Sequence, residues 1–448
     1  MMNKIFIVLL SLVLFSYLGV VSAHTENNSI YLGQEACAPC EPVEEQIEKP
    51  CDAVTCDSGD FYPYLFKRNR HRQSLLDSIE VFGWVQAGVY TNSRGNTVTR
   101  TKGANSNGRS VTQLELQSGN GNLFSTVQST DFLVNQVWLG VKKDADGTHG
   151  LDWGFAAEGY FGPEAWIAQS WGDANFDYGW QDGDYYTAIP QLYAQLAYGN
   201  LSVKLGKFET ILGFESLRAP DFFFFSHSYI FLLEPYSHSG AFFQYTPGNK
   251  WSFGAAYTTG TDTSIENAYD DHGFIGTISY QLSNKLNLSY AVMYNHNGYG
   301  AYVSETSDPN NTGLNRYGLS GTNVYLHTVA ANYSISDKWN YSLQWNYNDV
   351  KTREDGSHTF AYGIANYLTY QFNDHWGIGF RAEWAKNILG YETDISEYTF
   401  GVNWKPYSNI SIRPELRYDY SANKIEKPFN NGLNRDQFSG GITGIVSF

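Results

Sequence analysis

From residue 79 to residue 448 the sequence repeats one unit: a segment of alternating apolar and polar residues, a tight turn, a second such segment and a longer polar connection. In one of these segments Ile412 and Leu416 share one face, whereas Arg413 and Glu415 share the other. Because successive side chains of a strand point to opposite faces, a period of two predicts strands that are apolar on one side and polar on the other. The expected fold class is therefore all-β.

Two kinds of β-protein show such alternation, namely a soluble sandwich and a transmembrane barrel whose polar face lines the lumen. Aromatic residues make up 17% of the chain and gather near the ends of the predicted strands. Trp376 and Trp384 bracket one segment, and Trp339 and Tyr347 bracket another. Amphipathic rings prefer the two interfaces of a bilayer, so this placement favours the barrel. After residue 23 no run of about 20 mostly apolar residues occurs, which argues against membrane-spanning helices.

We expect an antiparallel transmembrane β-barrel of about 16 strands, within a range of about 14 to 18 because boundaries read from one sequence drift by several residues. Tight turns alternate with longer loops along the whole series. Outer-membrane barrels place short turns in the periplasm and long loops outside. The strands are predicted at 79–91, 131–143, 148–161, 189–199, 201–209, 238–247, 250–260, 272–282, 285–296, 323–335, 338–350, 359–372, 375–387, 395–404, 409–419 and 436–448.

The N-terminus has the features of an export signal. Lys4 precedes the apolar run from Ile5 to Val21, and Val21-Ser22-Ala23 offers small residues for cleavage before His24. Residues 1–23 are therefore predicted to be a signal peptide, with a membrane anchor as the alternative.

Residues 24–78 comprise a separate acidic segment, which contains all the cysteines of the chain, and the basic linker that leads from it to the barrel. In an exported protein, clustered cysteines indicate disulfides, and two bridges would staple this segment. A zinc knot with four thiolate ligands is compatible with the same spacing. The basic stretch near Lys67 reads equally well as an amphipathic helix or as a solvated linker. The four cysteines are Cys37, Cys40, Cys51 and Cys56.

Several function classes are disfavoured by charge and by motif content. The formal net charge of −16 argues against binding to nucleic acid, which needs a positive surface. The motifs of zinc proteases, α/β-hydrolases, P-loop proteins and dinucleotide-binding proteins do not occur in the sequence. We therefore expect neither an enzyme nor a cofactor.

Short segments in the strands and in one long loop resemble the β-barrel porin-2 (OmpL-like) family. They are 203–208 (VKLGKF), 213–215 (GFE), 225–228 (FSHS) and 234–240 (EPYSHSG), supported by 83–85 (GWV) and 189–193 (IPQLY). The resemblance covers about Ile79 to Phe448, so residues 79–448 are expected to be the barrel, and the cysteine segment lies outside it. It implies a porin of the bacterial outer membrane, without a particular solute. It also implies a homotrimer, which is a common assembly among similar porins. Independently of the resemblance, Phe448 shares its face with Val446 and Ile442, as in terminal strands that barrel-assembly machinery reads, so this machinery is an expected partner during biogenesis.

The polar faces of the predicted strands supply the candidate lumen residues. A barrel of about 16 strands is too wide for its side chains to fill, so it leaves an aqueous channel. Fixed charges on its wall would bias the passage of ions, although the same charges can simply keep the wall hydrated and rigid. The predicted pore-lining residues are Lys204, Arg381, Glu383, Arg413, Glu415, Arg417 and Asp419.

The third external loop, Thr210 to Ser237, contains two apolar runs, Phe222 to Phe225 and Tyr229 to Leu233. These cannot all face water without creating a sticky patch, so we expect the loop to fold inward and narrow the pore. An additional strand pair or a loop that contacts another subunit would also bury them. The residues expected at the constriction are Glu215, Arg218, Asp221, His227 and Glu234.

The sequence thus predicts a water-filled channel for passive diffusion of small hydrophilic solutes or ions, embedded in outer-membrane lipid. The rival hypothesis is a non-conducting barrel that serves as an envelope scaffold, an adhesin or a sheath for a partner. Both the cysteine segment and the apolar loop could occlude the lumen in that case.

Overall fold

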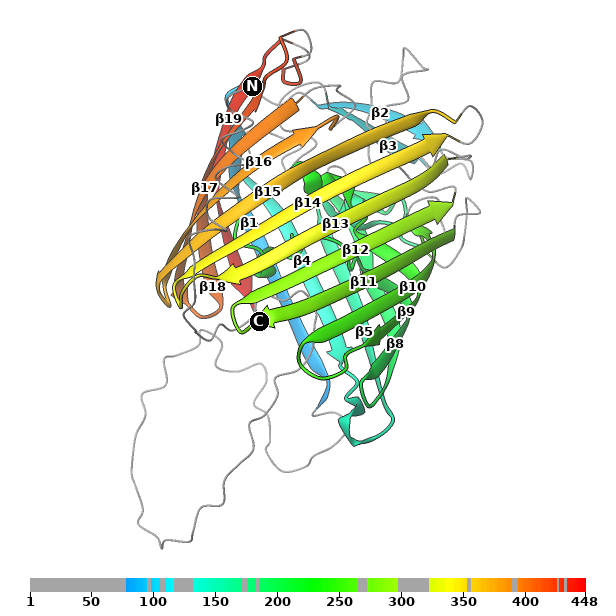
Figure 1. Cartoon of the computed structure of the whole chain (residues 1–448). Coiled ribbons are helices and arrows are strands. Elements are labelled where there is room, and N and C mark those ends of the chain that lie inside the picture. The colour runs from blue at the N-terminus through cyan, green and yellow to red at the C-terminus, as the bar shows by residue number, and fades with distance from the viewer. Residues whose placement is uncertain are drawn as a thin grey trace, which may run out of the picture.

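The computed structural model describes residues 78–94, 98–104, 110–116, 132–170, 176–182, 185–264, 272–296, 322–352, 356–388, 394–424, 427–430 and 433–448. The predicted signal peptide, the four cysteines and most of the predicted linker lie outside these residues. The described chain forms a closed, 16-strand antiparallel β-barrel (Figure 1), and the two-residue strand β6 adds a seventeenth member to the sheet. The predicted fold class is confirmed.

The barrel strands are β1 (Glu80–Asn92), β4 (Phe132–Lys143), β5 (Asp152–Gly162), β7 (Tyr185–Tyr198), β8 (Leu201–Glu209), β9 (Ser237–Tyr245), β10 (Trp251–Thr261), β11 (His272–Ser283), β12 (Leu286–His296), β13 (Thr322–Ser334), β14 (Trp339–Thr352), β15 (His358–Asn373), β16 (Trp376–Lys386), β17 (Asp394–Tyr407), β18 (Ile410–Ser421) and β19 (Asp436–Ser447). Each predicted strand has its counterpart here.

The barrel closes through its first and last strands. β1 pairs with β4 on one side and with β19 on the other, both antiparallel. At the seam Gly83 and Phe448 exchange backbone hydrogen bonds of 2.9 Å, which places Phe448 beside the start of β1. The short turns lie at this same end of the barrel, and the connection between β8 and β9 belongs to the opposite end (Figure 1). Closure leaves no unpaired strand edge, which is the requirement for a sheet that meets lipid.

The two faces of the wall follow the alternation of the sequence. On β18, Leu416 is 68% exposed on the outside, whereas Arg417 is 1% exposed on the inside. Aromatic rings stack on the outer surface near the short-turn end, as between Trp376 and Trp404 (5.6 Å) and between Trp251 and Tyr280 (4.2 Å). An apolar outer belt with aromatic residues at its rim is typical of barrels that span a bilayer.

Several details differ from the predicted strand pattern; for example, β7 begins at Tyr185 instead of residue 189, and β17 ends at Tyr407 instead of residue 404. β5 begins at Asp152 instead of residue 148, because residues 147–149 form a 3-10 turn, η2 (Gly147–His149). The Asp146 carboxylate caps that turn by accepting a hydrogen bond of 2.9 Å from the N–H of Thr148. The first long connection contains an unpredicted hairpin, β2 (Val98–Ala104) and β3 (Ser110–Leu116), and β6 (Gln181–Asp182) lies in the second.

The interior contains apolar clusters as well as polar groups. Two 3-10 turns from the connection between β8 and β9, η4 (Ala219–Asp221) and η5 (Ile230–Leu233), pack inside the barrel, and η3 (Ala165–Ala168) packs against β5 and β7. Tyr229 and Ile230 are fully buried against Tyr367 and Ile395 of the wall. Among the described residues, no helix combines the length and the apolar character that crossing a bilayer requires.

Candidate functional site

Residues 210–236, which we call the inward loop, connect β8 to β9 and lie in the lumen (Figure 1). The loop returns to its starting point, because the N–H of Thr210 donates to the carbonyl of Tyr236 (2.9 Å) directly beyond the Glu209–Ser237 pair of the two strands. The inward fold predicted for this loop is therefore what the structure has. Since the loop has no regular hydrogen-bond ladder, its backbone groups need partners from the wall.

Carboxylates of the wall accept hydrogen bonds from the loop backbone. On β18, Glu415 accepts from the N–H groups of Phe225 (2.8 Å) and Ser226 (3.2 Å). On β16, Glu383 accepts from Tyr229 (2.7 Å) and Ile230 (2.8 Å). Each carboxyl group thus satisfies two consecutive donors, which fixes the path of the chain.

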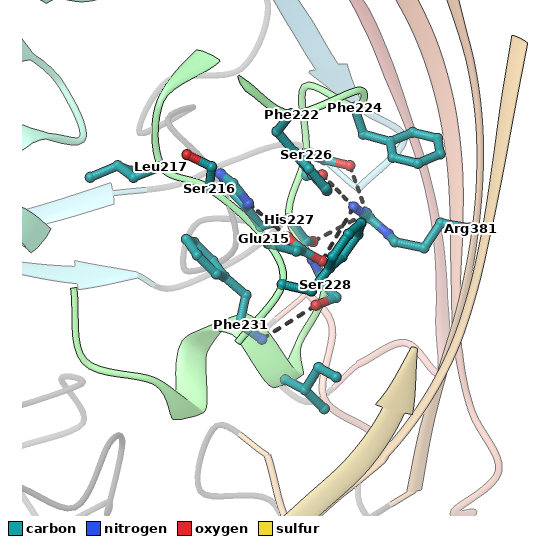
Figure 2. A network of polar contacts seen from close by, with 12 residues as sticks. Glu215, Ser216, Leu217, Phe222, Phe224, Ser226, His227, Ser228, Phe231 and Arg381 are labelled. Atoms are coloured by element: carbon teal, nitrogen blue, oxygen red, sulfur yellow. Dashed lines mark hydrogen bonds and ion pairs between the residues drawn. The ribbon is translucent and has the colours of Figure 1, made fainter. Parts of the chain in front are cut away.

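Arginines of the same wall donate to the carbonyl groups of the loop. Arg413 donates through Nη1 to the carbonyls of Ala219 (2.9 Å) and Phe222 (2.8 Å), and Arg417 donates to His227 (2.6 Å). Figure 2 shows Arg381 reaching from the wall to the loop, where it donates to the Ser226 hydroxyl (2.9 Å), the Ser226 carbonyl and the His227 carbonyl (3.2 Å). The wall therefore binds both the donors and the acceptors of the loop.

The charges of this contact also neutralise one another. Arg381 pairs with Glu397 of β17 (3.0 Å), and Arg417 pairs with Asp419 (2.8 Å). The Tyr229 hydroxyl donates to the same Asp419 (2.9 Å). Buried charges are tolerated only with such partners, because leaving water costs several kcal/mol per ion.

A second anchor joins the loop to the opposite side of the lumen. Arg218 bridges Glu158 of β5 (2.5 Å) and Glu209 at the end of β8 (2.9 Å). Its guanidinium also lies over the ring of Trp138 at 5.2 Å. The indole of Trp138 stacks between Trp84 (4.8 Å) and Tyr160 (4.9 Å), so this anchor rests on an aromatic layer.

Glu215 and His227 form a pair within the loop, in the network of Figure 2. The His227 Nδ1 lies 2.7 Å from a Glu215 oxygen, and the imidazole stacks between Phe222 (5.3 Å) and Phe231 (3.9 Å). Burial disfavours ionisation of Glu215, but the hydrogen bond from His227 and the positive charge of Arg381 outweigh it and lower the pKa of Glu215 to about 2. The carboxylate is thus ionised wherever the loop is docked.

Glu234, near the C-terminal end of the inward loop, is bound by uncharged side chains. Its Oε1 accepts from Gln344 (2.6 Å) and Asn346 (2.8 Å) of β14. A Cβ at Gly213, where φ is +82°, would lie 2.0 Å from the other oxygen, so only glycine fits opposite this carboxyl. Burial raises the pKa of Glu234 to about 8, which keeps the group protonated at neutral pH.

The predicted wall residues all face the lumen, and most of them meet the loop. Arg381, Glu383, Arg413 and Glu415 bind its backbone, as does Arg417. Each of the arginines and carboxylates predicted on β16 and β18 is at most 4% exposed, so the loop covers them. Lys204 of β8 lies apart from this group, with its Nζ 4.6 Å from the centre of the Tyr193 ring.

Of the residues predicted at the constriction, Glu215, Arg218, His227 and Glu234 are buried, and Asp221 is exposed. The sequence analysis did not single out the partners of these residues, namely Glu158, Glu397, Gln344, Asn346 and Tyr367. All of them occupy inward positions of predicted strands, so the alternation identifies their face. It does not identify which of the many inward polar residues the loop contacts.

The polar side chains of this site that the structure describes make contacts that hold the loop. No group of three or more His, Cys, Asp or Glu side chains among them is placed to hold a metal ion. The hydroxyl of Ser228 accepts from the N–H of Phe231 (3.3 Å), and that of Ser226 accepts from Arg381. These hydroxyl contacts therefore help to hold the inward loop in place inside the barrel.

Comparison with known proteins identifies relatives of this architecture. The family model described as "Putative beta-barrel porin-2, OmpL-like" matches residues 78–448. In-vitro folded OmpT in its trimer form, an outer membrane protein of Vibrio cholerae, has a TM-score of 0.52 at 10% identity, over 83% of this chain and 99% of that chain. The loop L8 deletion mutant of OmpT has a TM-score of 0.52 at 11% identity, with the same coverage of both chains. At such identities the likeness concerns the fold alone. No curated protein matches the sequence.

Proposed function

This chain belongs to the β-barrel porin-2, OmpL-like family, whose model matches residues 78–448, and we propose that it conducts small hydrophilic solutes or ions by passive diffusion. The chain is an integral β-barrel of the outer membrane. The observation that supports this proposal best is a closed barrel of 16 strands with a polar inner face. A barrel of that width leaves an aqueous channel unless something fills it.

The inward loop sets the size of that channel in this proposal. The loop forms hydrogen bonds with β16 and β18 on one side and ion pairs with β5 and β8 on the other. It therefore crosses the lumen instead of lying in the external medium. Solutes would pass beside the loop, along the part of the wall that it leaves uncovered.

The deciding experiment is single-channel recording with the purified, full-length protein in planar bilayers. Stepwise insertion events with a linear current–voltage relation are expected of a permanently open porin. Membranes that stay silent despite inserted, folded protein would contradict the proposal, with insertion checked by protease protection in liposomes of the same lipid.

One observation favours the rival function, a non-conducting scaffold or sheath. The run from Tyr229 to Leu233 is at most 4% exposed, so the loop fills part of the lumen with apolar side chains. The two functions differ in conductance, and the same recordings distinguish them.

We also propose a homotrimer as the assembly in the membrane. Its support is the trimer form in which OmpT of Vibrio cholerae, a protein of similar fold, was solved. The mass of the protein in a mild detergent, measured by light scattering after subtraction of the detergent, tests this proposal, and a single protomer would contradict it.

A further inference from the structure

One part of the inner wall is polar, uncharged and open. On β11–β15, toward the short turns, the inward side chains retain access to solvent instead of packing under the loop. The Ser342 hydroxyl donates to the Asn332 side chain (2.7 Å), a bond between two uncharged groups of neighbouring strands. We call this surface the uncharged wall; its central members are Ser279, Gln281, Ser289, Asn332, Ser342 and Thr369.

The uncharged wall differs from β16–β18 in its lack of ionised groups. Within the described residues of β11–β15, no inward position holds Lys, Arg, Asp or Glu. The arginines and carboxylates of β16–β18 are enclosed and paired. A solute on the uncharged wall thus meets hydroxyl and amide groups, which donate and accept hydrogen bonds with no net charge.

Beside this wall lies one aromatic ring that is only partly covered. Phe223 of the inward loop rests on a floor of glycines in β16, since a Cβ at Gly379 would lie 2.4 Å from its ring. A Cβ at the neighbouring Gly377 would be 3.5 Å from Phe223 and 2.6 Å from the side-chain oxygen of Gln371. The ring and an uncharged hydrogen-bonding group therefore lie within reach of the same solute.

From this juxtaposition, and resting on the proposed channel function, we propose that the uncharged wall together with Phe223 is a path for neutral, hydroxyl-rich solutes of monosaccharide size. Hydroxyl groups exchange water for the Ser, Thr, Asn and Gln side chains with little loss, and the C–H face of a sugar packs on the ring. An ion gives up part of its hydration in a narrow lumen and finds no counter-charge on this wall, so its passage is disfavoured.

The test compares three probes of one size and different charge in liposomes that contain the full-length protein. Glucose is neutral, gluconate is an anion and glucosamine is a cation. Swelling rates in isosmotic solutions should be several-fold higher for glucose than for either ion. A faster rate for gluconate or for glucosamine would overturn the inference and leave the channel function intact, whereas no entry of any probe, combined with silent bilayers, would overturn both.

Variants locate the path. Ser289→Asp puts one negative charge on the uncharged wall and should make glucosamine faster than gluconate, with a reduced rate for glucose. The matched control is Asn284→Asp, the same change of charge in the exposed β11–β12 turn, which should leave the order of the probes unchanged. Equal effects of the two variants would contradict the assignment of the path.

The role of the ring is tested by Phe223→Leu, which keeps an apolar side chain on the glycine floor. The glucose rate should fall at least twofold relative to gluconate and glucosamine. An equal change for all three probes would mean that the ring only shapes the lumen, and it would remove Phe223 from the proposed path. Heat-modifiable mobility in electrophoresis verifies that each variant barrel is folded.

Discussion

Two walls of this barrel share the same alternation and differ in what their inward side chains do. On β16–β18 the inward positions carry Arg381, Glu383, Arg413 and Glu415, which are enclosed by the inward loop. On β11–β15 they carry uncharged polar side chains that remain accessible toward the short turns. A charged side chain that points into the lumen therefore does not necessarily contact a solute, because the inward loop can cover it. In this lumen the loop encloses the charges of β16–β18, and it also contacts β14 and β15 through amide and hydroxyl groups. Only the inward positions nearer the short turns of β11–β15 stay accessible.

The difference has a physical cause in the hydrogen bonds of the backbone. The strands use their own N–H and C=O groups in the ladder, so an irregular loop inside the barrel must find its partners among side chains. Ionised donors and acceptors form stronger hydrogen bonds than neutral ones. A wall that fixes a loop of this kind is therefore expected to contain arginines and carboxylates, as β16 and β18 do.

The largest effect is expected from deletion of residues 222–233, which removes most of the side chains that the charged wall holds. Conductance should rise several-fold because the uncovered part of the lumen widens and Arg381 and Arg417 come into contact with solvent. Ion selectivity should appear at the same time, measured as a reversal potential in a salt gradient. An unchanged conductance would show that the loop lies outside the conducting path.

A smaller effect, on stability, is expected from a single change on each wall. Arg381→Met removes the closer of the two arginine partners of buried Glu397, with Arg417 remaining at 3.8 Å, and should lower the free energy of unfolding by about 3 kcal/mol. Ser342→Val, on the uncharged wall, removes one neutral hydrogen bond and should cost about 1 kcal/mol. Urea unfolding of both variants in the same detergent provides the measurement.

A second substitution, at Glu397, separates the effect of the lost ion pair from the effect of the remaining buried carboxylate. Glu397→Gln added to Arg381→Met removes the carboxylate that has lost its closer partner, so the double variant should regain part of the lost stability. If the two substitutions are strictly additive, or if Ser342→Val costs as much as Arg381→Met, the charged wall has no special role in stability.

The smallest effect is a dependence on pH that arises where the loop meets β14, through Glu234. The pKa of Glu234 is raised from 4.5 to about 8, so the docked state binds a proton more tightly than the undocked state. Docking is thus most stable below pH 4.5 and weakens as the pH rises toward about 8, above which the loss is complete. Glu234→Gln should flatten this part of the profile of melting temperature against pH. An unaltered slope would assign the titration to another group.

The strands were predictable because their signal is local. Each barrel strand has a predicted counterpart, and β8 (Leu201–Glu209) has the predicted bounds, because a period of two is written directly into the sequence. The start of β5 was missed because the Asp146 carboxylate caps a turn there, and such a competing local bond is weakly visible in sequence. The inward fold of the loop was also predictable, since two apolar runs in one loop require burial.

The partners of the loop were not predictable. Glu383 and Glu415 were recognised as inward, yet their binding to Tyr229 and Phe225 joins residues 154 and 190 positions apart in the chain. Such pairs depend on how the loop crosses the lumen. For the same reason the sequence left open whether the charges of β16 and β18 meet solutes or only keep the wall hydrated and rigid, and no pattern in it distinguishes Ser289 or Asn332 from other inward residues.

By itself the sequence determined the barrel, its strand order, the two faces of its wall and the burial of the apolar runs, because these properties follow from the chemical character of successive residues. Only the tertiary structure decided which inward groups are covered and which stay open. That distinction arises because the irregular backbone of the loop takes its hydrogen bonds from particular inward side chains of several strands, among them Gln344, Glu383 and Glu415, and no local pattern records which ones.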